Sequence, residues 1–127
     1  MLAETRSLAQ QASAETVMTK AVVRASEALG MTARTLSAVL GVSEASVSRM
    51  RRQDYRLERG TKPFELAVLF IRLFRSLDAI VGGDEAVARA WMSAENRLLG
   101  GRPIDRVTSI SGLVDVLAYL DARRALV

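Results

Sequence analysis

The segment that most restricts how this chain folds is PFELAVLFIRLFRSLDAIV, at residues 63–81. It is apolar on most sides of a helix, and Pro63 suits the first turn of one. Charged residues such as Glu65, Arg72 and Asp78 interrupt it too often for a helix inside a bilayer. The segment therefore predicts either the central helix of a hydrophobic core or a seam between copies of the chain.

The other apolar residues recur at steps of three and four rather than alternating, which predicts an all-α fold. The expected helices run from Val17 to Leu29 after Ser13, over Ala33–Leu40, over Glu44–Arg52, from Asp84 to about Leu99, and through Leu113 to the end. The polar stretch QDYRLERGTK is expected to be a loop or hinge. We therefore predict an N-terminal helical bundle at residues 1–62 and a C-terminal helical domain at residues 63–127.

The residue types that are missing narrow the range of functions. The 127 residues include neither Cys nor His, which removes disulfides, thiolate and imidazole metal ligands, and the commonest general base. We expect no catalytic residue, no metal site, no cofactor and no enzymatic activity. The amino terminus MLAETRSLAQQ lacks the regions of a signal peptide, and the absence of Cys suits a reducing compartment. The sequence thus predicts a cytoplasmic protein that does not contact a membrane.

Positive charge is concentrated in the first half of the chain. The formal net charge is +4, and residues 1–63 hold ten Lys or Arg against six acids, whereas residues 64–127 hold eight of each. Basic residues are densest between positions 49 and 62. This density suits a polyanion such as DNA, although a solvated helix face is the reading that charge alone favours.

The segment from Leu36 to Met50 has the spacing of a helix-turn-helix. Two short helices that meet near a right angle need a small residue at their closest approach and a glycine in the turn. Ser37 is the small residue, and Gly41 follows four positions later. The apolar positions that fix the angle are Leu36, Leu40, Val42, Val47 and Met50. A helical hairpin that serves only packing is the alternative.

The second helix of such a unit enters the major groove of DNA with its start and outer face. The predicted DNA-contacting residues are Ser43, Glu44, Ala45, Ser46, Ser48, Arg49, Arg51 and Arg52. Arg49 and Arg52 suit bidentate contact with guanine, whereas the serines and Arg51 equally suit phosphates. One small module makes few base contacts, so a homodimer on repeated half-sites is expected.

The C-terminal half carries a different set of landmarks. Its helix after Asp84 has an apolar stripe at Val87, Ala90, Trp91, Ala94 and Leu98. Asn96, Leu99, Gly101, Pro103 and Gly112 complete the set. Taken singly, each is most simply a core residue or part of a sharp turn.

Because these landmarks occur in this order, the segment AWMSAENRLLGGRPIDRVTSISGLVDVLAYL resembles the toxin-binding domain of the MbcA/ParS/Xre antitoxin family. That family shows a Trp, then an Asn-x-x-Leu-x-Gly-x-x-Pro motif or one close to it, then a final helix led by Gly. The spacing departs slightly here, because Gly101 lies two residues before Pro103 and Gly100 is the alternative family glycine. The helix-turn-helix ahead of this domain extends the resemblance over nearly the whole chain.

The resemblance implies an antitoxin with two activities. It binds a cognate RES-domain toxin, an enzyme that consumes NAD, and occludes the active site of that enzyme. It also represses its own operon. The resemblance implies this toxin and operator DNA as partners, with a homodimer inside a larger toxin–antitoxin complex. The residues suggested for toxin binding or neutralisation are Trp91, Asn96, Arg102, Arg123 and Arg124. The last two are expected to meet an anion pocket or acidic residues of the toxin, with stabilisation of the helix end through its dipole as the alternative.

Three other interpretations stay open at this point. The first is a dimeric helix-turn-helix repressor without a toxin partner. The second is an interaction protein whose basic patch binds RNA or nothing. The third is an enzyme that uses Asp and Glu as general acid and base, although the chain has no glycine-rich phosphate loop or nucleophile motif to place them.

Overall fold

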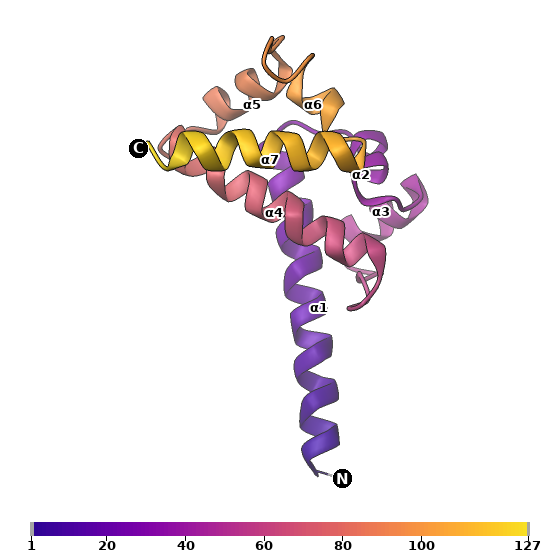
Figure 1. Ribbon diagram of the computed structural model, residues 1–127. Helices are drawn as coiled ribbons and strands as arrows, with labels where there is room; N and C mark the ends of the chain where they lie inside the picture. Colours follow the sequence, from indigo (N-terminus) through magenta and orange to yellow (C-terminus); the bar gives the residue numbers. More distant parts are fainter. Residues whose placement is uncertain (1, 127) are drawn as a thin grey trace.

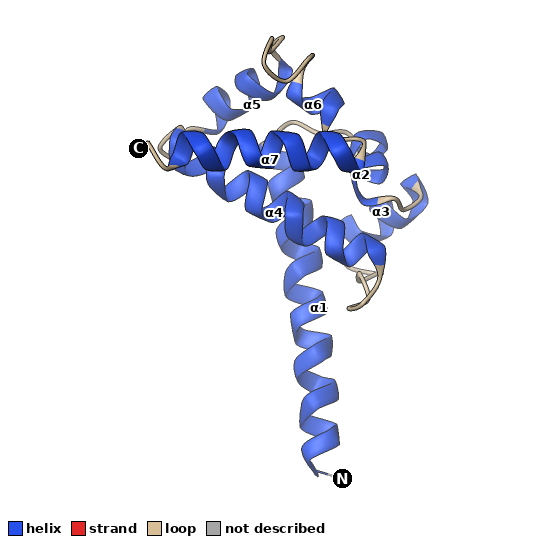
Figure 2. Ribbon diagram, in the orientation of Figure 1, coloured by secondary structure: helices blue, strands red, loops and turns tan. Residues whose placement is uncertain are grey.

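The computed structural model describes residues 2–126, with side chains over residues 7–126. This part of the chain is all-α, which confirms the predicted fold class. The helices are α1 (Leu2–Ala28), α2 (Ala33–Leu40), α3 (Glu44–Arg51), α4 (Lys62–Ile80), α5 (Glu85–Ser93), α6 (Pro103–Arg106) and α7 (Ile110–Arg124). Figure 1 shows α1 as a long rod whose N-terminal half extends beyond the body that the other helices form. Loops join the remaining helices into a compact group (Figure 2).

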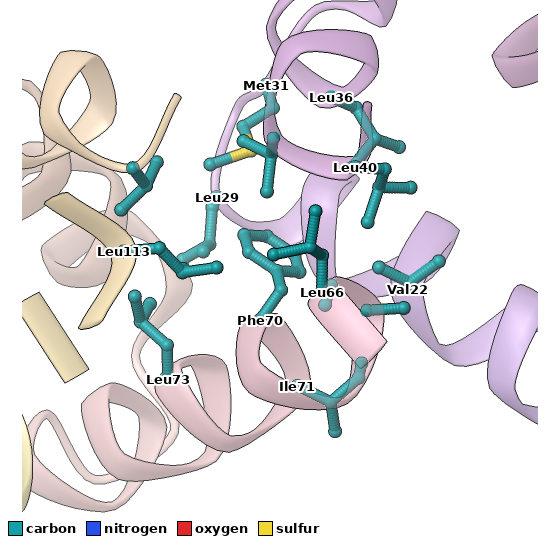
Figure 3. Packing of buried hydrophobic residues seen from close by; sticks show 14 of the residues in the cluster. Val22, Leu29, Met31, Leu36, Leu40, Leu66, Phe70, Ile71, Leu73 and Leu113 are labelled. Atoms are coloured by element: carbon teal, nitrogen blue, oxygen red, sulfur yellow. The ribbon is translucent and has the colours of Figure 1, made fainter. Parts of the chain in front are cut away.

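The apolar segment that the sequence singles out is α4, and it is the central helix of the core. It packs most extensively against α7 and also contacts α1, α2 and α5. Phe70 on α4 is fully buried. Apolar side chains of other helices gather around it, among them Val22 of α1, Leu36 of α2 and Leu113 of α7 (Figure 3). Burial of this kind is the dominant favourable contribution to folding. The prediction of a central core helix at residues 63–81 is therefore confirmed, and a seam between copies stays untested.

One hydrophobic cluster joins the two halves of the chain. It runs from Val22 in α1 through Leu40 and Phe70 to Leu120 in α7 without a break. The predicted boundary between residues 62 and 63 falls in the first turn of α4. This helix packs against α1 and α2, which precede the boundary, and against α5 and α7, which follow it. The division into two regions stays a proposal, and the core that they share gives them a fixed arrangement.

Capping side chains set where most of these helices begin, as the sequence indicates. Thr32, Ser43, Asp84 and Ser109 each accept a hydrogen bond from the backbone N–H three residues further on. Gly41 closes α2 in the left-handed region at φ 71°, where glycine is the least strained residue. The predicted bounds of α2 and α3 are accurate to within one residue because these local signals determine them.

The first helix is much longer than predicted. It begins at Leu2 rather than after Ser13. Residues 2–14 contain Ala, Leu, Glu and Gln, which favour a helix, and no Gly or Pro that would stop one. The apolar periodicity becomes clear only where the helix meets the body, so the sequence pattern revealed the packed half and missed the projecting half.

The fifth helix is shorter than predicted, and it buries a different face. It ends at Ser93, because Ala94 is extended and the next residues form a turn. The buried residues are Ala88 and Met92, whereas Val87 is 49% exposed and Leu98 is 82% exposed. The expected apolar stripe was therefore wrong, apart from Trp91, which is half-buried. The true core face is one position later in the helical repeat.

Candidate functional site

The turn between α2 and α3 has the geometry of a helix-turn-helix. The backbone N–H groups of Gly41 and Val42 both donate to the carbonyl oxygen of Ser37, at 2.9 and 3.2 Å. Ser37 itself is half-buried, and its hydroxyl donates to the carbonyl oxygen of Arg34 within α2. Of the residues predicted to fix the angle, four are buried and Val42 is half-buried against the same core; the buried ones are Leu36, Leu40, Val47 and Met50. The predicted inward positions of α3 are correct.

Most of the predicted DNA-contacting side chains lie on the outer surface. Ser43, Glu44, Ala45, Arg49, Arg51 and Arg52 are exposed, and Ser48 is half-buried. Ser46 differs, since only 8% of it is exposed. Its hydroxyl accepts from Ser43 Oγ at 3.0 Å and from the Arg49 guanidinium at 3.3 Å. Ser46 therefore supports the first turns of α3 from within, and it positions Arg49.

The arginines of α3 are held in different ways. Arg49 lies over the ring of Tyr55, with its guanidinium carbon 5.8 Å from the ring centroid. Arg52 pairs with Asp54 at 3.5 Å in an exposed salt bridge. Arg51 donates to the carbonyl oxygen of Met31 at 3.5 Å, a long contact. Because these contacts are solvent-exposed or weak, little free energy is needed to turn the guanidinium groups toward a new anion.

The loop after α3 is fastened to α1 rather than free to act as a hinge. The N–H of Leu57 donates to the buried hydroxyl of Thr19 at 2.9 Å, and the N–H of Arg59 donates to the Glu15 carboxylate at 2.7 Å. Leu57 is itself buried in the core. The expectation of a loop is confirmed, and three side chains, those of Glu15, Thr19 and Leu57, anchor it.

In the C-terminal region, an aromatic pair links two helices. Trp91 on α5 stacks on Tyr119 on α7, with ring centroids 6.0 Å apart. The Arg123 guanidinium lies 5.6 Å from the Tyr119 ring centroid and donates to the Tyr119 hydroxyl at 3.1 Å. Two residues predicted for toxin binding, Trp91 and Arg123, are thus brought together by Tyr119. Sequence reasoning missed Tyr119, although it lies four residues before Arg123 on the same helix face.

The other residues predicted for toxin binding are less connected. Asn96 shapes the turn after α5, because its side-chain oxygen accepts from the N–H of Leu99 and its backbone pairs with Gly101. Arg102 forms a bidentate pair with Asp105 at 2.9 and 3.2 Å. These hydrogen bonds, with the nearby negative charge, raise the pKa of Arg102. Arg124 is exposed at the end of α7. Asn96 therefore supports the turn after α5, Arg102 lies exposed at the start of α6, and Arg124 lies at the far end of α7.

Large apolar side chains are exposed in the same region. Ile110 and Val114 are 56% and 47% exposed, and they are four residues apart on α7, so they lie on one side of that helix. Val87 on α5 and Leu98 in the following turn are exposed as well. Adjacent exposed apolar side chains such as Ile110 and Val114 are typical of a protein-binding face. The sequence does not reveal this exposed face, because apolar periodicity does not show which side of a helix is buried.

Metal-binding clusters and membrane-spanning helices are both absent from the described residues. No group of three or more acidic side chains is arranged to hold a metal ion in that part of the chain. Over the same residues, no helix is long and apolar enough to cross a membrane.

Two family models match the chain, one over each half. Residues 9–72 match the family model described as the antitoxin Xre-like helix-turn-helix domain. Residues 76–125 match the one described as the antitoxin Xre/MbcA/ParS C-terminal toxin-binding domain. The architecture is therefore that of a helix-turn-helix protein joined to a toxin-binding domain. The chain belongs to the Xre/MbcA/ParS antitoxin family. No curated protein matches it.

Proposed function

We propose that this antitoxin neutralises a RES-type NAD-degrading toxin by covering its active site, and that it represses its own operon through α3. The observation that carries the proposal is the presence of two separate exposed surfaces on helices that share one hydrophobic core. A basic helix face lies in the helix-turn-helix domain, and apolar side chains together with arginines lie in the toxin-binding domain. This arrangement lets one chain hold both partners.

For DNA, we propose that the outer face of α3 enters the major groove. Arg49 and Arg52 are the proposed base-reading residues, because both are exposed and each has a guanidinium that fits guanine. The other members of the proposed interface are Ser43, Glu44, Ala45, Ser48 and Arg51, with Ser46 as a support for Arg49. A homodimer on two half-sites supplies the contacts that one α3 lacks.

For the toxin, we propose contact through α7 and the turn after α5. Ile110 and Val114 provide apolar area, and Arg123 and Arg124 provide charge near the end of the same helix. Trp91 acts through Tyr119, which holds Arg123 in place. Neutralisation in this form needs no chemistry by the antitoxin, since it only has to bind the toxin more tightly than the substrate does. Family membership likewise favours a regulatory protein over an enzyme.

The proposed setting is the cytoplasm, where operator DNA, toxin and NAD occur together. Because DNA and toxin surfaces share one core, toxin binding is expected to change operator affinity by altering the number or spacing of antitoxin copies on DNA. Operator affinity measured at increasing toxin ratios tests this coupling. Equal affinities at every ratio contradict it.

The decisive experiment is growth of a bacterial host that expresses the gene adjacent to this one, with and without this chain, while cellular NAD is followed. We expect the neighbour to stop growth and deplete NAD, and the chain to restore both. A toxin that stops growth without loss of NAD contradicts the RES assignment but leaves the antitoxin role. A harmless neighbour favours the second candidate function, a dimeric repressor without a toxin partner, which the complete helix-turn-helix supports by itself.

A further inference from the structure

A basic groove lies between α1 and the end of α3. It consists of two adjoining concavities of about 350 and 290 Å³. They share Lys20, Met50 and Gln53, so they form one continuous depression. We call it the α1–α3 groove and define it by the residues Lys20, Arg24, Met50, Arg51, Gln53 and Arg56. The helix-turn-helix pattern explains α3 but gives no reason for cations on this side of α1.

The cations on the α1 wall are exposed and available. Lys20 and Arg24 are one helical turn apart, about 6 Å along the axis, and both are exposed. Among the side chains that the structure describes, neither forms a salt bridge. Two positive groups that are unpaired, adjacent and on the same face repel each other, so an anion that binds both is favoured.

The opposite wall adds further positive charge and few free acids. Arg51 and Arg56 line it, and Arg56 is tied to Glu15 at 3.5 Å. Two acids also line the groove, and one of them, Asp54, pairs with Arg52 at 3.5 Å. Glu27 is the remaining one, at the far end of the second concavity. The groove therefore has an excess of positive charge, and side chains of both walls contribute to it.

The groove is also preformed and continuous with the reading helix. Gln53 adopts a left-handed backbone conformation with φ 63°, which turns the chain back toward α1. The anchoring of Leu57 on Thr19 then holds the loop in place. Tyr55, which lines the groove, carries Arg49 over its ring. A ligand strand that meets Arg49 on α3 can thus continue directly into the groove.

We infer that the α1–α3 groove binds the phosphate backbone of the operator strand next to the major groove that α3 enters. Lys20 and Arg24 are the phosphate-binding residues of α1, and this assignment rests on the DNA-binding half of the proposed function. Such contacts position the protein without reading sequence. The DNA backbone is favoured over an acidic protein segment because the groove adjoins α3 in the helix-turn-helix domain, away from the toxin-binding region at residues 76–125.

The test measures the affinity of the full chain for a random-sequence DNA duplex over a range of NaCl concentrations. Each phosphate contact contributes about 0.9 to the slope of log affinity against log salt. The double substitution Lys20→Ala and Arg24→Ala is expected to weaken binding and to reduce the slope by roughly 1.8. The exchange Lys20→Arg and Arg24→Lys keeps both charges and is expected to preserve the slope.

The matched control is Arg75→Ala with Arg97→Ala, which removes the same charge from two exposed cations outside the groove. If both double variants reduce the slope equally, the effect is one of net charge and the groove assignment is wrong.

If Arg49→Ala with Arg52→Ala weakens binding while the groove variant behaves as the control does, only the groove assignment fails. If the unaltered chain binds neither this duplex nor its own upstream DNA, the proposed repressor function fails with it. Loss of a co-purified toxin without a change in slope assigns the groove to a protein partner instead. Thermal unfolding of each variant checks that it is folded.

Discussion

The indole ring of Trp91 and the phenol ring of Tyr119 are stacked with their planes only 20° apart. Trp91 belongs to α5 and Tyr119 to α7, so the pair joins the two helices directly. Elsewhere α5 meets the body mainly through α6, α1 and α4. The same Tyr119 holds the guanidinium of Arg123 through its ring and its hydroxyl. The stack therefore connects the position of α5 to that of a charged side chain near the end of α7.

Removal of the stack is expected to destabilise the fold and to release Arg123. Trp91→Ala loses the stacking contribution of about 0.5 to 1.5 kcal/mol in addition to buried apolar area. Tyr119→Phe keeps the ring and loses only an exposed hydrogen bond, so it serves as the control with nearly unchanged stability. Urea unfolding gives both values. In a double-mutant cycle with Tyr119→Ala, additive effects would show that the rings do not interact.

Gly112 allows α7 to approach α6 closely, and a larger residue there should be costly. A Cβ atom at this position would overlap with the carbonyl oxygen of Arg106 and lie 2.9 Å from Ser109 Oγ. The obstacle is backbone, so it cannot move aside as a flexible side chain does. Gly112→Ala is expected to lower the free energy of unfolding by about 3 kcal/mol.

The neighbouring Ser111 provides the control for this prediction. It is exposed on the same turn, so Ser111→Ala should change the stability by less than about 0.5 kcal/mol. Thermal or urea unfolding of the two variants is the measurement. Equal stability of both would mean that α6 shifts freely, and that the close approach does not determine how this region packs.

Local signals predicted the helix-turn-helix well, and the C-terminal surface poorly. Thr32, Gly41 and Ser43 act within a few residues of their own position, so their chemistry can be read along the chain. The face that α5 buries depends on contacts with helices distant in sequence, and no spacing rule distinguishes Met92 from Val87. The basic groove was missed for the same reason, since Lys20 and Arg56 come together only after α1 and the loop have packed.

Asp121 is expected to contribute more to stability than its salt bridge suggests. Its carboxylate accepts from the hydroxyl of Ser76 at 2.7 Å and pairs with Arg72 at 3.4 Å, which links α7 to α4. Ser76 is only 2% exposed, so Asp121→Ala leaves a buried hydroxyl unsatisfied at a cost of about 1 to 3 kcal/mol.

The contrast is with Arg72→Ala, which breaks only the exposed ion pair. That variant should lose at most about 1 kcal/mol, and less at high salt. Denaturant unfolding at two salt concentrations separates the effects. If Arg72→Ala were the more damaging change, the ion pair rather than the buried hydrogen bond would be what fastens α7 to α4.

A negative charge on the outer side of α7 is expected to abolish toxin binding while leaving DNA binding intact. Ile110 and Val114 are exposed, so Ile110→Glu with Val114→Glu should not disturb the core. Acidic residues near the start of a helix also interact favourably with its dipole. In an apolar interface the same charges are desolvated without a partner, which is expected to lower toxin affinity at least about 100-fold.

The measurement is co-purification of the toxin with this variant, alongside operator binding by the same protein. The reciprocal variant, Arg49→Ala with Arg52→Ala, should lose operator binding and keep the toxin. Opposite losses in the two variants mean that each surface serves one partner. If the glutamate variant retains the toxin, the binding face is elsewhere in residues 76–125, and the arginines at the end of α7 become the next positions to change.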